Sequence, residues 1–307
     1  MIPRRRFRRR HVLAILLALV LLAVGAMSTN VLGVRDKAQS VAQRIERRIS
    51  LFVDPPPDRP IAAIVKVTPR PEVSETQTPS GPPESLAPGA TPRPTPTPKP
   101  QRARVDVNLF KHPENHFMSE EFNHEWCAVA GTQMVLEIHG KGQLGLPFQK
   151  TLASRIGEWE SRRDSHNGGW GPSAIVAALE AYGVKGYEVR AYETRADALY
   201  DAAKAIEKLH APVLLMAWRG AHTWVMTGFR ADADPLVFDD AKVNGTYILD
   251  PWYPLVSSIW GPSDPPGTYQ NGDEMRRNYL PWKRPEGRYP ERDGMFLAVV
   301  PTKALNR

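Results

Sequence analysis

The sequence predicts an α+β domain at residues 103–307, behind an N-terminal hydrophobic segment and a proline-rich stretch. Two observations favour this class. Apolar residues recur at helical spacing through the first half of the domain, and continuous or alternating apolar runs typical of strands follow in the second half. Helices first and strands afterwards indicate helices packed on an antiparallel sheet.

The net charge of +7 does not indicate a nucleic-acid partner. Six arginines fall within residues 4–10, at one end of the chain. Without this cluster the charges are nearly balanced, so the basic character belongs to a terminus and not to a binding face. We expect no nucleic-acid partner, no cofactor and no metal.

Residues 1–34 are predicted to be a basic stub followed by a transmembrane or signal-anchor segment. No Asp, Glu, Lys or Arg occurs from His11 to Val34, and about 20 apolar residues cross a bilayer as a helix. The arginines favour the cytoplasmic side, which sends the rest of the chain outward. We expect a single-pass cell-membrane protein with an extracytoplasmic domain, or a secreted one if the segment is a cleaved signal peptide.

Two segments are predicted between the membrane and the domain. Residues 35–53 have apolar positions at helical spacing among basic ones, which predicts a juxtamembrane amphipathic helix that lies on lipid, pairs with a copy of itself, or is simply solvated. Residues 54–102 contain half of the 30 prolines. Because proline cannot donate to helix or sheet ladders, this range is predicted to be a linker without a core.

The elements of the domain follow from periodicity and from capping residues. Four helices are expected, at residues 127–138, 152–159, 172–183 and 194–209. Four strands are expected, at residues 212–218, 222–229, 246–249 and 295–300. Asn244-Gly245 predicts a two-residue hairpin turn just before the third of these strands.

Cys127 is the only cysteine of the chain, and it stands at the beginning of the first predicted helix. A lone cysteine is more often an inert buried side chain than a reactive one. A helix N-terminus, however, presents unpaired amides and partial positive charge, which favour thiolate over thiol. The position therefore favours a nucleophilic role.

His222 opens one predicted strand and Asp250 follows another. If the two strands pair around the Asn244-Gly245 turn, residue 222 lies opposite residue 250, at one edge of the sheet. A carboxylate beside an imidazole orients the ring and stabilises its protonated form. Taken singly, His222 would be a satisfied core histidine, and Asp250 before Pro251 would simply begin a turn.

Three fragments in this order carry a resemblance to a known family: WCAVAGTQMVL around Cys127, GAHTWVMTGF around His222 and ILDPWY around Asp250. Together they resemble papain-like cysteine peptidases, and more narrowly the bacteriocin-leader (double-glycine) peptidase-like family and its stand-alone relatives. The resemblance spans roughly residues 115–300. It implies a papain-like fold and cleavage of peptide or protein substrates, with Cys127 as nucleophile, His222 as base and Asp250 as the orienting acid.

The sequence departs from that family at the expected oxyanion donor. Relatives place a glutamine about six residues before the cysteine, where this chain has Glu121, which cannot donate unless protonated. Asn123 is the nearest amide donor, and His124 is the next candidate. The negative charges of Glu121 and Glu125 also disfavour a thiolate.

Three other interpretations remain open. The domain could be an inactive peptidase-like binding module, as Glu121 suggests, or an acyl or amide transferase that uses the same three residues. His124 and Cys127 also have the spacing of half a metal site. The chain offers no second cysteine to complete such a site, which is why no metal is expected.

Overall fold

A computed structural model describes residues 49, 53, 56–71, 100–120, 125–164, 170–257, 261–283 and 288–304. The chain divides into two units, Met1–Pro56 and Pro57–Arg307. The predicted segment 1–34 lies outside the described residues, and of 35–53 only Ile49 and Val53 are described, both helical. Within the described part, no helix is long and apolar enough to cross a membrane.

The second unit is a mixed α+β domain, as predicted. Its described residues form α3 (Cys127–Ile138), α4 (Leu146–Ser154), α5 (Ile156–Trp159), α6 (Pro172–Ala181), α7 (Arg195–Leu209) and α8 (Gly272–Asn278), with 3-10 helices η2 (Pro113–His116) and η3 (Trp218–Gly220). The four predicted helices are confirmed, although the second is divided into α4 and α5. The side chain of Thr194 accepts from the amide of Asp197, which caps α7.

A mostly antiparallel sheet forms the centre of this unit. Its strands are β1 (Ile64–Lys66), β2 (Val105–Asn108), β3 (Tyr187–Tyr192), β4 (Val213–Ala217), β5 (His222–Ala231), β6 (Val243–Leu249), β9 (Thr268–Asn271) and β10 (Phe296–Pro301). They are ordered β1-β3-β10-β4-β5-β6-β9, with β2 paired to β5. Two further short strands, β7 (Val256–Ser257) and β8 (Gly261–Pro262), pair with each other.

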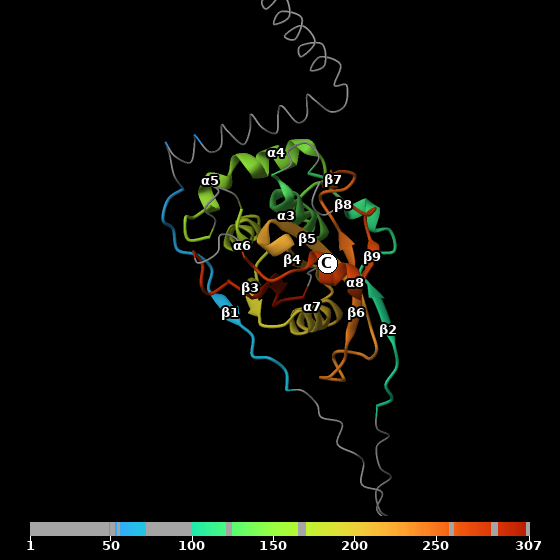
Figure 1. Cartoon of the computed structure of the whole chain (residues 1–307). Coiled ribbons are helices and arrows are strands. Elements are labelled where there is room, and N and C mark those ends of the chain that lie inside the picture. The colour runs from blue at the N-terminus through green and yellow to red at the C-terminus, as the bar shows by residue number, and fades with distance from the viewer. Residues whose placement is uncertain are drawn as a thin grey trace, which may run out of the picture. The chain divides into compact units, whose positions relative to one another are not determined.

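Helices cover both faces of the sheet (Figure 1). On β4, Leu214 and Met216 belong to the core cluster that includes α3 and α6, whereas Val213 and Leu215 belong to the cluster that includes α7. Each face therefore buries its own apolar side chains, at roughly 1.5–3 kcal/mol for a large aliphatic group. This two-sided burial explains why the sequence of β4 is continuously apolar and does not alternate.

The predicted hairpin turn at Asn244-Gly245 is wrong. Both residues lie inside β6, and the connection from β5 runs through residues 232–242. Gly245 is needed for another reason: a Cβ at this position would lie 2.3 Å from the carbonyl oxygen of Gln270 and 2.6 Å from the ring of Tyr269. A glycine inside a strand often marks such a close approach.

The prediction of a coreless linker over 54–102 is also wrong in part. Ile64–Lys66 form β1, which pairs in parallel with β3 at the edge of the sheet. Contacts on both sides of β1 hold the segment, through Arg59 to Ser161 and through Arg70 to Asp197 at 2.9 Å. The prolines flank IAAIVKV but do not interrupt it, so this short run can donate to the sheet.

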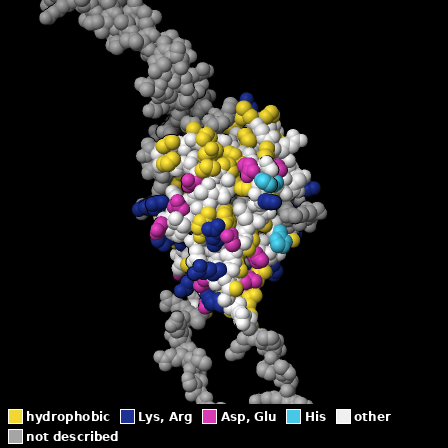
Figure 2. Space-filling view, turned by 90° about the vertical axis from the view of Figure 1, so that its right-hand side faces the viewer, with side chains coloured by type: hydrophobic (Ala, Val, Ile, Leu, Met, Phe, Trp, Pro, Cys, Tyr) yellow, Lys and Arg dark blue, Asp and Glu magenta, His cyan; other side chains and the backbone are white. Residues whose placement is uncertain are grey.

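The face shown in Figure 2 gives no sign of a basic binding surface. Acidic and basic side chains lie interspersed there, beneath a group of hydrophobic side chains. Among the residues drawn in colour, this face therefore carries no extended patch of one charge.

Deleting residues 61–67 from the full chain is expected to destabilise the domain by about 1–3 kcal/mol, because it removes the hydrogen bonds of β1 and its packing on the sheet edge. The measurement is the midpoint of chemical unfolding, followed by far-UV circular dichroism. A deletion of equal length within residues 80–95 is the control. Equal midpoints for the two deletions would contradict a stabilising role for β1.

Candidate active site

Cys127 occupies the first position of α3 and is half-buried. Four residues along the helix, Gly131 brings α3 close to the sheet. A Cβ on Gly131 would lie 3.2 Å from the methyl carbon of Thr223 and 3.4 Å from a methyl carbon of Leu214. The absence of a side chain at residue 131 therefore sets how near Cys127 comes to the start of β5.

His222 is the first residue of β5 and is only 3 % exposed. The turn that precedes it has left-handed backbone, with φ of 50° at Trp218 and 83° at Gly220. A Cβ on Gly220 would meet the ring of Trp282 at 2.2 Å, so only glycine fits. The ring of Trp218 stacks on His222, with centroids 4.1 Å apart and planes 19° apart, which restrains the imidazole.

Asp250 follows the end of β6 and meets His222 at the same end of the sheet, as predicted. The Nε2 of His222 donates to Oδ1 of Asp250 at 2.6 Å, and the same oxygen accepts from the amide of Trp252 at 2.9 Å. The carboxylate thereby fixes the tautomer of the ring. It leaves Nδ1 to face the side of Cys127.

The register that brings these residues together differs from the predicted one. Val225 pairs with Leu249, so residue 250 falls opposite residue 224, two positions from the prediction. Side chains alternate between the two faces of a strand, so a shift of two keeps the same face. His222 and Asp250 are thus diagonal neighbours, which long side chains can still bridge.

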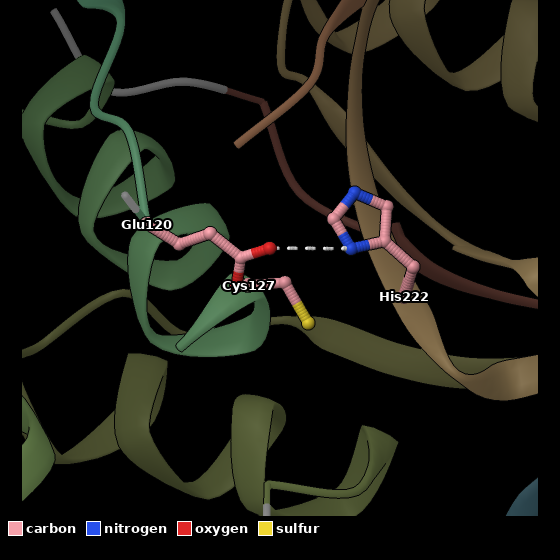
Figure 3. Close-up of side chains that lie close together, drawn as sticks. All are labelled: Glu120, Cys127 and His222. Atoms are coloured by element: carbon pink, nitrogen blue, oxygen red, sulfur yellow. Dashed lines mark ion pairs between the residues drawn. The ribbon is translucent and has the colours of Figure 1, made fainter. Parts of the chain in front are cut away.

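Glu120 is the site residue that the sequence analysis missed. It is 1 % exposed, and its Oε1 lies 3.8 Å from Nδ1 of His222 (Figure 3). Its amide donates to the carbonyl of Pro251 at 2.8 Å, which ties this segment to the turn after Asp250. Oε2 has no hydrogen-bond partner among the described residues.

The backbone amide of Cys127 also lowers the pKa of the Glu120 carboxyl, in opposition to the effect of burial. A backbone amide at a helix N-terminus can hold an oxyanion, and the carboxyl of Glu120 lies within 4.8 Å of the sulfur of the same residue, Cys127. The other oxyanion candidates, Glu121 and Asn123, lie outside the described residues, as does His124. One signal in the sequence could have pointed to Glu120: this acid directly precedes Glu121, the position where relatives have the glutamine.

Burial and charge shift the proton equilibria of this site. Burial raises the pKa of Glu120 to about 8, against the opposing attraction of His222. Burial by itself lowers the pKa of His222, but the charge and hydrogen bond of Asp250, and then those of Cys127, raise it well above its ordinary value. The site therefore favours the neutral acid form of Glu120 and the protonated form of His222.

The same atoms could hold a metal ion. The sulfur of Cys127, a ring nitrogen of His222 and a carboxylate oxygen of Glu120 all lie within 4.8 Å of one another. Figure 3 shows Glu120 and Cys127 approaching the ring from the side of α3.

The fold and the site define a mixed α+β domain with a cysteine, a histidine and two acids gathered at one end of its sheet. Comparisons with known protein families, with characterised proteins and with solved structures found no match to this chain.

The variant Glu120→Gln should be more stable than the wild type, with the gain growing from about pH 4 to about pH 8 and staying constant above that. The native state holds the proton of Glu120 up to about pH 8, whereas the unfolded chain loses it near pH 4.3, so unfolding becomes easier as the pH rises. The raised pKa of His222 has the same sign, and its contribution is lost as the pH rises through the folded value.

The measurement is the free energy of unfolding against pH, in the presence of a chelator. Exposed Glu180 on α6 supplies the control, since Glu180→Gln should keep the wild-type slope. Parallel pH curves for wild type and Glu120→Gln would show that Glu120 is not a buried acid.

Proposed function

We propose that this chain is a membrane-anchored, extracytoplasmic thiol hydrolase that cleaves peptide or amide bonds. The observation that carries the proposal is that His222 donates to Asp250 through Nε2 while a nitrogen of its ring lies within 4.8 Å of the sulfur of Cys127. This arrangement puts the one thiol of the chain, an imidazole of fixed tautomer and an orienting carboxylate in a single group. The resemblance to papain-like peptidases of the bacteriocin-leader family supports the same chemistry and a papain-like fold.

In the proposed reaction, Nδ1 of His222 takes the thiol proton and the sulfur of Cys127 attacks the amide carbonyl carbon. The C–N bond then breaks as the imidazolium returns its proton to the leaving amine. A thioester to Cys127 remains. Water, deprotonated by His222, attacks the thioester, and the thiol and a carboxylic acid are released. The raised pKa of His222 favours the imidazolium that the first step requires.

The proposed chemistry requires Glu120 to be in its neutral, protonated form. A carboxylate beside Cys127 would repel a developing oxyanion, whereas the neutral acid can donate a hydrogen bond to it. Because burial raises the pKa of Glu120 to about 8, the neutral form is available at neutral pH. Losing one oxyanion donor typically costs about 10²–10³ in rate, which slows an enzyme of this class without abolishing its chemistry.

The substrate proposal follows from location. The arginine-flanked hydrophobic segment favours a domain outside the cytoplasm, whereas double-glycine leaders are cleaved inside the cell. A double-glycine leader is therefore a poor candidate, and a cell-wall peptide is a better one.

A second candidate function is a binding module that keeps the same site but has no turnover. The observation that favours it is the buried carboxyl of Glu120, which lies within 4.8 Å of the sulfur of Cys127 and would repel a developing oxyanion when ionised. An acyl or amide transferase remains a variant of the first proposal, and an added amine acceptor would reveal it through the product.

Thiol labelling tests the proposed function directly, because Cys127 is the only thiol. Wild type should react with iodoacetamide well below pH 8.5, the ordinary pKa of a free thiol, and His222→Ala should react about 10-fold or more slowly near pH 6.5. The control is His112→Ala, which removes an exposed imidazole away from the site. Equal rates for wild type and His222→Ala, in the presence of a chelator, would end the enzyme hypothesis.

The spacing between α3 and β5 gives a second test. Gly131→Val should push Cys127 away from His222 and slow the labelling by about 10- to 100-fold, since a displacement near 1 Å can cost that much. Gly157→Val is the matched control, because a Cβ at Gly157 meets nothing within 4 Å. Wild-type labelling by a folded Gly131→Val protein would contradict the role given to this close approach.

A further inference from the structure

We propose that Glu120, Cys127 and His222 form a reversible Zn²⁺ site, and that the bound ion blocks the thiol of Cys127. The proposal that Zn²⁺ binds rests only on the geometry of the three side chains. The inhibitory part rests on the proposed hydrolase function, because it concerns the same nucleophile and base.

The donor set matches the ligand preference of Zn²⁺. Thiolate, imidazole and carboxylate are its usual protein ligands, and sites with three protein ligands keep a fourth position for water. Ligand atoms around a tetrahedral zinc ion lie about 3.5 Å apart, given bonds of about 2.0–2.3 Å. The Nδ1 of His222 and Oε1 of Glu120 are 3.8 Å apart, and the three donor atoms lie within 4.8 Å of one another, so a contraction of at most about 1.2 Å closes the site.

The surroundings supply the other parts of such a site. Zinc-binding histidines commonly donate their second ring N–H to a carboxylate, and Nε2 of His222 does so to Asp250 at 2.6 Å. This bond holds Nδ1 toward Glu120 and Cys127. The tryptophan stacked on the ring restrains it further.

Burial and access fit the same interpretation. Glu120 and His222 are 1 % and 3 % exposed, and Oε2 of Glu120 has no hydrogen-bond partner among the described residues. A buried acid without a cationic partner other than a histidine is costly unless a cation neutralises it. Cys127 is half-buried and is the most exposed of the three ligands, so it is the side from which an ion would enter.

Bound zinc would exclude the proposed reaction. The ion takes the lone pair of the sulfur and that of Nδ1, so neither the nucleophile nor the base is free. Removal of the ion restores both. The site thus gives the chain a metal-dependent off state that needs no change of fold.

Cobalt spectroscopy on the purified full chain tests the binding. Stoichiometric Co²⁺ should give a thiolate-to-cobalt charge-transfer band, which reports Cys127 because no other cysteine exists, with d–d bands of tetrahedral intensity. Zn²⁺ should displace the cobalt, protect Cys127 from iodoacetamide, and release it again when a chelator is added.

Variants separate the contributions of the ligands. Cys127→Ser should abolish the charge-transfer band and weaken Zn²⁺ binding more than about 100-fold. Glu120→Gln and Asp250→Asn should each weaken binding about 10- to 100-fold while the band is kept. The control is Glu137→Gln, which removes the carboxylate of a different imidazole–carboxylate pair, 2.8 Å from His116, and should leave the affinity unchanged.

Two results would overturn the site: no charge-transfer band from the folded wild type, or equal Zn²⁺ affinity for Glu120→Gln and Glu137→Gln. Labelling of the metal-free protein keeps this failure apart from that of the proposed function. Thiol activation by His222 without zinc binding would remove the metal site alone. Zinc binding without activation would remove the hydrolase alone.

Discussion

The hydrogen bond from His222 to Asp250 is the constraint on which the site depends. It joins the first residue of β5 to the residue after β6, so it forms only if these strands pair in the observed register. It also fixes which ring nitrogen carries the proton. A neutral imidazole held this way presents the lone pair of Nδ1 to Cys127, and that single orientation serves both a general base and a metal ligand.

Glu120 turns this familiar arrangement into one with surplus negative charge. Two buried carboxyl groups and a half-buried thiol surround one buried imidazole. Such a group can be neutralised by a proton or by a cation, and the two proposals correspond to these two solutions. With a proton on Glu120 the site can stabilise a tetrahedral intermediate, and with a divalent ion it is closed to substrate.

The sequence was most informative where local pattern and burial agree. The helices at Cys127, Pro172 and Thr194 have apolar spacing and start signals, and all three form. Asn244-Gly245 gave a wrong prediction because a turn preference is a local property. Glycine is required at residue 245 because the backbone and a tyrosine ring of the neighbouring strand β9 leave no room for a side chain. β1 was hidden because a strand of three residues in a proline-rich range gains its stability from pairing with β3, which no local pattern reports.

By itself, the sequence determined the helices from α3 to α7, the strands β4, β5, β6 and β10, and the meeting of His222 and Asp250 at one end of the sheet, whereas it missed α8, β2, β3 and β9. Side chains of a strand alternate between the two faces of the sheet with a period of two. The error of two residues in the predicted β5–β6 register therefore left both side chains on the correct face. Only the tertiary structure decided which acid accompanies Cys127. The segment before α3 is positioned by hydrogen bonds to the turn after Asp250, more than a hundred residues away, and these select Glu120. Long-range contacts of this kind leave no periodic signal in a sequence, because either partner alone looks like an ordinary surface loop.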